Sequence, residues 1–274
     1  MARSILITGC SSGIGLDAAR TMKQRGWRVI ATARNAEDLN RLNTYEGLEV
    51  LRLELADPQS IATCAIRALE LTHGHLDALF NNAAYGQPGA VEDLTPALLR
   101  EQLEVNLVGT HDLTRRLIPS MRKNGAGRIV NCSSVLGMVV APYRGAYCAS
   151  KFALEALTTS LRLEPEVSGI GVSLIEPGPI RSRFVEHSVA RLLATIDIDN
   201  SPHRDVYRTR LEQMKAGGQI SFKLEPEAVS KRLIHAVESS RPKAHYYVTT
   251  PTLIAAAMRR LLPQFGIDYF ARRF

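Results

Sequence analysis

The chain has 274 residues, of which 45% are hydrophobic and 22% are charged, and this is the composition of a globular protein rather than a disordered or fibrous one. No apolar run approaches the roughly 18–20 residues that a membrane span needs. The N-terminus enters an apolar run at Ile5 without room for a signal peptide, so we expect a cytoplasmic protein.

The formal net charge of +7 comes from 34 basic and 27 acidic residues, and no basic run is interleaved with aromatic residues. This pattern predicts a solvated basic surface and no nucleic-acid interface. The cysteines Cys10, Cys64, Cys132 and Cys148 form no CxxC pair and have no histidine at a metal-ligand spacing. We expect reduced thiols and no metal site.

Short β-branched apolar runs alternate with longer helical patterns along the chain. Strands are expected at 4–7, 28–31, 48–53, 76–80, 128–131, 172–175 and 246–248. Helices are expected up to residue 24 and over 37–42, 59–71, 96–121, 146–164 and 225–237. The alternation predicts an α/β fold with a seven-stranded, mostly parallel sheet, helices on both faces and doubly wound Rossmann topology.

No linker divides the chain, so we expect a single Rossmann-type domain over residues 1–274. The segment 181–223 interrupts the alternation with weak periodicity just after an expected strand, which favours a lid over the substrate. The helical tail over about 251–274 mixes apolar residues with arginines. The tail could lie on a membrane surface, although packing against the core or a sister subunit is favoured.

A glycine-rich segment, Thr8-Gly9-Cys10-Ser11-Ser12-Gly13-Ile14-Gly15, follows the first expected strand directly. Gly9 would allow a tight turn, and Gly13 and Gly15 would let the backbone approach a pyrophosphate. The N-terminus of the next helix supplies free N–H groups and a favourable dipole. We expect a dinucleotide there, in contact with Gly9, Ser11, Ser12, Gly13, Ile14 and Gly15.

The second expected strand ends in Ala31-Thr32-Ala33-Arg34, without the carboxylate that usually holds the ribose 2′-hydroxyl of NAD. The Arg34 guanidinium instead offers a planar fork that matches a 2′-phosphate. We therefore expect NADP(H) to be favoured over NAD(H).

Tyr147 and Lys151 are four residues apart in an expected helix, so they share one helical face. A tyrosine can exchange the hydroxyl proton during hydride transfer if its pKa falls from about 10 towards neutrality. A neighbouring ammonium and an oxidised nicotinamide would both favour the phenolate. Ser134, Asn82 and Pro177 follow other strands, at the edge where doubly wound folds place their sites.

These motifs together resemble the short-chain dehydrogenase/reductase family from residue 4 to about 182: TGxxxGIG from Thr8, Asn81-Asn82-Ala83, Asn106, Ser134, Tyr147-x-x-x-Lys151 and Pro177-Gly178. The resemblance implies that Tyr147 is the general acid/base and that Lys151 lowers its pKa and binds the nicotinamide ribose. It also implies that Ser134 orients the substrate oxygen and that Asn106 holds a water in the proton relay.

The resemblance implies further cofactor contacts. Asn82 and Ala83 would touch the adenosine-side ribose, and Glu54 and Leu55 would lie near adenine, where the family usually has Asp in place of Glu54. The nicotinamide amide would be framed by Pro177, Gly178 and Ile180. Three positions depart from the family pattern: Ala84 replaces a usual glycine, Ser182 a usual threonine, and Ser12 a basic residue that some NADP-dependent members carry.

Within the family, residues 5–15, 175–180 and 258–263 resemble the branch of 17β-hydroxysteroid and retinol dehydrogenases and of bacterial aldehyde or ketone reductases. The branch implies an oxidoreductase of a hydrophobic alcohol/carbonyl pair. Because cells usually keep NADP reduced, the expected choice of NADP(H) predicts a carbonyl reductase. The family resemblance also implies a homodimer or homotetramer. A catalytically silent NADP-binding sensor on the same fold is the alternative. It is disfavoured because a sensor has no physical need for a low-pKa tyrosine.

The substrate is expected to contact the lid and the loops over 85–89 and 135–144. The side chains expected to make this region apolar are Val135, Leu136, Met138, Val139, Val140 and Phe184. On the helix expected over 146–164, Glu155 and Glu164 are expected to be solvated or to lie at a subunit interface.

Overall fold

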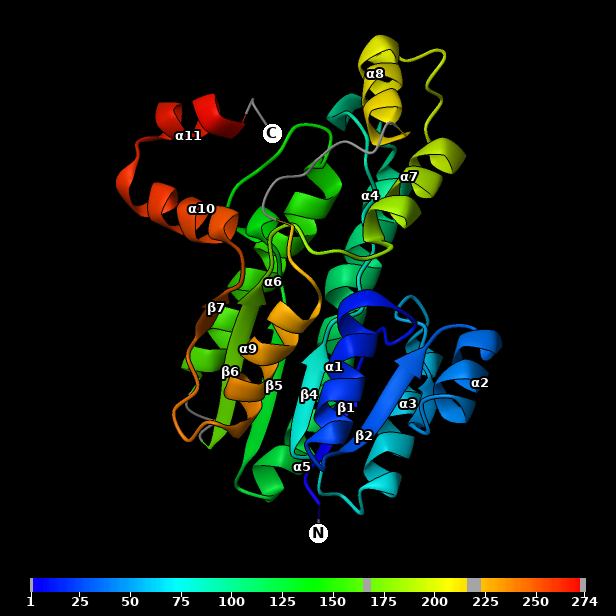
Figure 1. Ribbon diagram of the computed structural model, residues 1–274, viewed down its shortest axis with the longest axis vertical. Coiled ribbons are helices and arrows are strands. Elements are labelled where there is room, and N and C mark those ends of the chain that lie inside the picture. Colours follow the sequence, from blue (N-terminus) through cyan, green and yellow to red (C-terminus); the bar gives the residue numbers. More distant parts are fainter. Residues whose placement is uncertain (1, 165–168, 216–222, 272–274) are drawn as a thin grey trace.

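A parallel sheet forms the centre of the computed structural model, which describes residues 2–164, 169–215 and 223–271 (Figure 1). Its seven strands lie in the order β3-β2-β1-β4-β5-β6-β7, and every neighbouring pair is parallel. The predicted doubly wound α/β fold is therefore confirmed. The strands are β1 (Ser4–Ile7), β2 (Arg28–Ala33), β3 (Glu49–Arg52), β4 (Ala78–Asn81), β5 (Gly127–Cys132), β6 (Ile170–Glu176) and β7 (His245–Tyr247).

The strand order reverses between β1 and β4. The chain first builds outward from β1 to β3, then returns to β4 and builds in the other direction to β7. In open parallel sheets the crevice at such a reversal, outside the carboxyl ends of the strands, is where ligands bind. The sheet topology therefore places the candidate site above β1 and β4.

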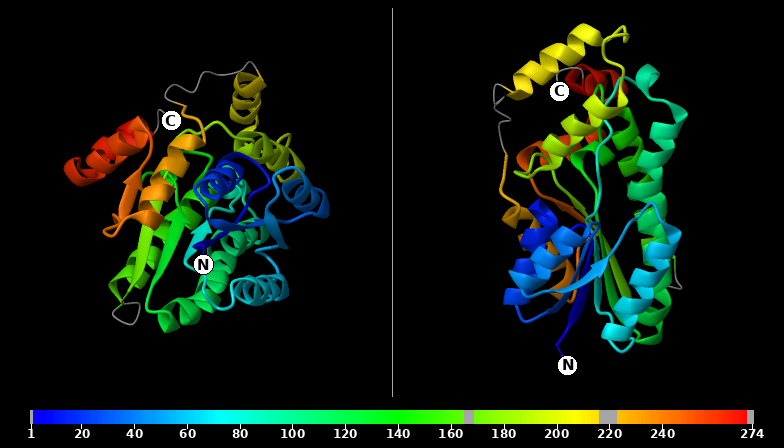
Figure 2. Two further views of the ribbon diagram at one scale, coloured as in Figure 1. Left: turned by 60° about the horizontal axis from the view of Figure 1, so that its bottom comes forward. Right: turned by 90° about the vertical axis from the view of Figure 1, so that its right-hand side faces the viewer.

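Helices cover both faces of the sheet. α1 (Gly13–Gln24) and α9 (Glu227–Glu238) pack together on one face, while α3 (Pro58–Leu71) and α5 (Thr110–Lys123) pack together on the other (Figure 2, right). The remaining α-helices of the described chain are α2 (Ala36–Thr44), α4 (Pro96–Leu103), α6 (Gly145–Leu163), α7 (Phe184–Thr195), α8 (Arg204–Lys215), α10 (Thr250–Leu261) and α11 (Gln264–Ala271).

The two faces of the sheet contribute to two separate cores. In β1, Ile5 and Ile7 belong to the core beneath α1 and α9, whereas Leu6 between them belongs to the core beneath α3 and α5. All three side chains are fully buried. Successive side chains on a strand point to opposite faces, so a strand covered on both faces needs an unbroken apolar run, as β1 has.

The helix expected over 96–121 contains a π-helical turn. α4 and α5 are joined through Glu104–Gly109, which is π-helical and includes Asn106. A Cβ on Gly109 would lie 2.0 Å from the carbonyl oxygen of Leu55, so only glycine allows this approach. Single π-turns widen a helix locally and are frequent at functional sites.

The insertion over 181–223 is more regular than its periodicity predicts, because it contains α7 and α8; residues 216–222 lie outside the described residues. Backbone hydrogen bonds join its two ends near the carboxyl edge of the sheet. The N–H of Arg181 donates to the Leu224 carbonyl at 2.8 Å, and the N–H of Leu224 donates to the Pro179 carbonyl at 3.1 Å.

A small apolar cluster joins the insertion to the loop after β4. Leu192, Ile196 and Tyr207 pack there against Ala90, and the Tyr207 hydroxyl donates to Asp93 at 2.7 Å. α7, α8, α10 and α11 all lie beyond the carboxyl end of the sheet (Figure 1). Among the helices that the structure describes, none combines the length and the apolar character required to span a bilayer.

The core beneath α1 and α9 gives a stability prediction. Phe80 on β4 is fully buried, whereas Phe265 on α11 is 78% exposed. We expect Phe80→Ala to lower the free energy of unfolding by about 3–5 kcal/mol, because it leaves a cavity in a packed core. The control, Phe265→Ala, should change it by less than about 0.5 kcal/mol. Urea unfolding followed by circular dichroism measures both, and equal losses would contradict the assigned core.

Candidate active site

A hollow of about 2510 Å³ lies over the carboxyl ends of the strands. It extends from the glycine-rich turn after β1 to the side chains of α7, α10 and α11. Pockets for drug-sized ligands usually measure about 300–1,000 Å³, so this hollow has room for a dinucleotide together with a second molecule.

The glycine-rich turn between β1 and α1 is shaped by two glycines without room for a side chain. A Cβ on Gly9, which has φ +72°, would lie 2.9 Å from the Ala83 Cα, and a Cβ on Gly15 would lie 2.1 Å from the Gly9 carbonyl oxygen. Ser12 begins α1 without a side-chain cap on the first N–H groups. The turn therefore offers uncapped N–H groups to an anion at close range.

The segment after β4 is fastened to this turn by Thr8. Its hydroxyl accepts hydrogen bonds from the N–H groups of Asn82 and Ala83, both at 2.9 Å. The Asn82 amide in turn donates to the carbonyls of Thr8 and Gly9 at 3.0 and 3.3 Å. Asn82 and Ala83 thus line the hollow where the sequence places them, and the Asn82 side chain holds the glycine turn in shape.

Arg34 lies at the far end of the hollow with its side chain 75% exposed. Its nearest acidic partner is Glu54, at 3.7 Å, a distance at which an exposed ion pair is weak. Sequence reasoning missed Arg41 on α2, which lines the same end and donates to the Ser11 carbonyl and to Asp38. This end of the hollow therefore presents two guanidinium groups.

Asn106 is buried in the π-helical turn, and its side chain is committed to the protein. The amide oxygen accepts from the N–H of Tyr85 at 3.1 Å, and the amide nitrogen donates to the Tyr85 carbonyl at 2.9 Å and to Ser150 at 3.1 Å. Both N–H bonds of the amide are thereby used. A water held by Asn106 would have to donate a hydrogen bond to the main-chain carbonyl of Asn106 or to the remaining lone pair of its side-chain oxygen.

Tyr147 and Lys151 lie together on the buried face of α6. The Lys151 ammonium donates to the Cys132 carbonyl at 2.8 Å and stands 5.7 Å from the centre of the Tyr147 ring. Burial raises the pKa of Tyr147 and lowers the pKa of Lys151. In the protein alone, desolvation thus outweighs the Ser134 hydrogen bond and the Arg144 charge, both of which lower the pKa of Tyr147. The expected fall in the tyrosine pKa requires a further positive charge beside the phenol.

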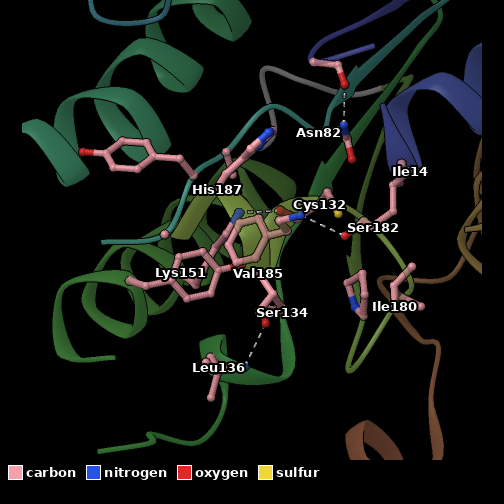
Figure 3. A pocket seen from close by; sticks show the side chains of 18 of the residues that line it. Ile14, Asn82, Cys132, Ser134, Leu136, Lys151, Ile180, Ser182, Val185 and His187 are labelled. Atoms are coloured by element: carbon pink, nitrogen blue, oxygen red, sulfur yellow. Dashed lines mark hydrogen bonds between the residues drawn. The ribbon is translucent and has the colours of Figure 1, made fainter. Parts of the chain in front are cut away.

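Ser134 follows β5 and faces the same part of the hollow as Lys151, while Ile14 and Ile180 line the opposite side (Figure 3). Its hydroxyl accepts from the N–H of Leu136 at 3.1 Å and acts to lower the pKa of Tyr147. The structure therefore brings Ser134, Tyr147 and Lys151 together from β5 and α6. The other cofactor residues expected from the sequence, from Gly9 to Ile180, line the same hollow, except Gly15, which shapes the turn from behind.

The end of the hollow near Phe184 is largely apolar, as expected. Of the apolar side chains expected there, only Met138 does not line the hollow; it is buried elsewhere. Sequence reasoning missed the apolar side chains of α10 and α11 that line it, namely Ile254, Met258, Ile267 and Phe270.

Glu155 is half-buried rather than solvated, and its expected place at a subunit interface stays a prediction. One of its carboxyl oxygens is buried, and ligand atoms of Glu155, Glu176 and His245 lie within 4.8 Å of one another. Glu176 accepts from the N–H of Tyr246 at 3.0 Å and shares a 2.6 Å hydrogen bond with His245. Burial, with the Glu155 charge second, raises the pKa of Glu176 to about 9.

The four-residue spacing from Tyr147 through Lys151 to Glu155 could have shown this in the sequence, because it puts all three on one helical face. Glu164, at the end of α6, is exposed as expected.

Comparison with known proteins gives the family. A model described as short chain dehydrogenase matches residues 3–192. Over 263 residues the chain is 41% identical to "Uncharacterized oxidoreductase YbbO" of Escherichia coli, covering 96% of this chain and 91% of that protein. It is 34% identical to human 17-beta-hydroxysteroid dehydrogenase type 1, covering 94% of this chain and 81% of the relative.

Similar solved structures include complexes with either nicotinamide cofactor. A single-residue variant of actinorhodin polyketide ketoreductase with NADPH matches with a TM-score of 0.72 and 26% identity, over 90% of this chain and 95% of that one. A short chain dehydrogenase/reductase from Burkholderia phymatum with NAD matches with a TM-score of 0.79 and 25% identity, over 99% and 95%.

The chain therefore belongs to the short-chain dehydrogenase/reductase family, in the branch that includes 17β-hydroxysteroid and retinol dehydrogenases. It is an oxidoreductase of the kind that acts on CH–OH groups with a nicotinamide cofactor.

Proposed function

We propose that the protein is an NADP(H)-dependent carbonyl reductase for a hydrophobic aldehyde or ketone, with Tyr147 as the general acid. The observation that carries this proposal is that Ser134, Tyr147 and Lys151 line the hollow together. They lie between its end at the glycine-rich turn and its apolar end. A proton donor and a fixed cation thus stand beside space for an apolar substrate.

The residues present fit a nicotinamide dinucleotide. A side chain at Gly9 would clash with Ala83, and one at Gly15 would clash with the Gly9 carbonyl, so both glycines are needed for the tight turn at the start of α1. The first N–H groups of α1 have no side-chain cap and can bind the pyrophosphate. Asn82, Ala83, Pro177 and Ile180 would line its path along the hollow. When bound, the nicotinamide supplies the hydride.

Tyr147 would donate its phenolic proton to the carbonyl oxygen as that oxygen gains electrons. Because burial raises the pKa of Tyr147, the phenol keeps this proton at neutral pH, which suits reduction. Ser134 would hold the same oxygen by a hydrogen bond, and Lys151 would stabilise the tyrosinate that remains. Asn106 would hold a water through which the proton is replaced.

Two arginines support NADP(H) over NAD(H). Arg34 and Arg41 line the end of the hollow where the ribose 2′-phosphate would lie, and a guanidinium fork matches a phosphate. Asp38 already pairs with Arg41, so Arg34 would contribute most of the preference.

The insertion from 181 to 223 would act as the substrate lid. Its base is tied at Ile180 and Leu224, while Phe184 on α7 packs against Tyr147 with ring centres 5.4 Å apart. Movement of α7 would therefore open or close the space beside the phenol.

Exposed apolar side chains on the helices after β4 and β5 support a homodimer or homotetramer. Val108, Leu157 and Leu163 are 46%, 45% and 69% exposed, and burying them against a sister subunit would be favourable.

Tyr147→Phe tests the proposed chemistry because it removes the proton and keeps the ring. With a panel of steroid, retinoid and medium-chain aldehyde carbonyls, we expect NADPH oxidation to fall by about 100- to 10,000-fold, the usual contribution of a general acid. Tyr45→Phe makes the same change at an exposed site and serves as the control. Equal turnover by the two variants would show that Tyr147 is not the acid.

Arg34→Ala tests the cofactor preference. Loss of a charge-assisted hydrogen bond of about 1.5–3 kcal/mol should raise the KM for NADPH by roughly 10- to 100-fold and leave that for NADH nearly unaltered. Arg67→Ala removes an exposed arginine of α3 that pairs with Glu70, and provides the control. An unchanged ratio of NADPH to NADH efficiency in Arg34→Ala would reject its assigned role.

A further inference from the structure

Arg144 stands immediately before α6, three residues before Tyr147, and lines the hollow. Its guanidinium has no hydrogen bond or ion pair with any other residue that the structure describes. Two other arginines that line the hollow are paired, Arg183 with Glu186 and Arg191 with Glu101. Arg144 is therefore a half-buried cation to which no carboxylate of the described part of the chain is paired.

A second arginine faces it from the insertion. Arg210 on α8 lines the hollow and also, together with Arg144, a small cavity next to it. Its guanidinium carbon lies 4.6 Å from the centre of the Tyr143 ring, and it too has no carboxylate partner in the described part of the chain. Burial and then the Arg210 charge lower the pKa of Arg144. Two like charges held together in a half-buried place are unfavourable unless an anion joins them.

The backbone next to Arg144 also favours an anion, because Arg144 lies at the N-terminus of α6. Tyr143 has φ +64°, in the left-handed region that non-glycine residues avoid, and its carbonyl accepts from the N–H of Gly89 at 3.1 Å. This turn leads directly into the N-terminus of α6, where Arg144 provides no side-chain cap. A helix N-terminus disfavours a cation and favours an anion. The dipole of α6 and the two arginines would therefore all attract an anion to this place.

We propose that Arg144 and Arg210 form an anion subsite, and that the carbonyl substrate carries a carboxylate or phosphate on its apolar body. The inference rests on the proposed reductase function. The planar fork of each guanidinium suits either anion. The nearby apolar lining from Val139, Val140 and Phe184 would hold the rest of the molecule. The subsite lies next to the small cavity lined by α7 and α8, on the substrate side of Tyr147.

Matched substrates test the subsite. An oxodecanoate, its methyl ester and the phosphate monoester of the corresponding hydroxyketone differ in the presence and kind of the anion. We expect kcat/KM to favour the acid or the phosphate over the ester in the unaltered protein. Arg144→Gln and Arg210→Gln should each lower that ratio by about 10- to 100-fold, as the loss of a charged hydrogen bond does. The preferred anion distinguishes a carboxylate substrate from a phosphorylated one.

Arg208→Gln is the matched control, since Arg208 lies on the same helix but is exposed and paired with Asp199 at 2.8 Å. It should leave the ratio unchanged. Calorimetric titration with oxodecanoate gives a readout without turnover, and its affinity should fall with Arg144→Gln and with added salt. If Arg144→Gln does not fold, Arg210→Gln makes the same test from α8.

The outcomes separate the two proposals. Equal or better turnover of the ester, or an unchanged ratio in both variants, would overturn the subsite while the reductase function stands. Binding of oxodecanoate that depends on Arg144, without turnover of any carbonyl, would support the subsite and reject the reductase function.

Discussion

Parallel pairing of all seven strands is the constraint on which the rest of the structure depends. It brings every carboxyl strand end to one edge, and the reversal between β1 and β4 opens a crevice there. The glycine turn follows β1, Asn82 follows β4, Ser134 follows β5 and Pro177 follows β6. Residues far apart in the chain thus line one hollow because of strand direction alone.

Burial at that edge governs the chemistry. Lys151 is 3% exposed and Tyr147 is 9% exposed, so both charged forms are disfavoured in the protein alone. The Cys132 carbonyl holds the Lys151 ammonium by a hydrogen bond. The positive charge of an oxidised nicotinamide would favour the phenolate of Tyr147. A site of this kind keeps the phenol protonated until the reaction needs the proton, and the same desolvation makes the unpaired Arg144 a strong attractor for an anion.

The features that could be predicted from the sequence are those encoded locally. Apolar runs such as Ile5-Leu6-Ile7 predicted the strands, and the Tyr147–Lys151 spacing predicted a shared helical face. The π-helical turn at Asn106 could not be predicted, because its last residue, Gly109, approaches the Leu55 carbonyl, which is distant in the chain. Tertiary packing likewise decided the burial of Glu155, the position of Arg41 and the approach of α10 to the hollow.

The proposed function depends on transfer of a hydride from the nicotinamide to a carbonyl carbon at this edge of the sheet. Reduction of decanal by NADPH that carries deuterium as its transferable hydrogen tests it most directly, with mass spectrometry of the product. We expect decanol with a single deuterium on the former carbonyl carbon. Decanol without deuterium at that carbon would contradict it.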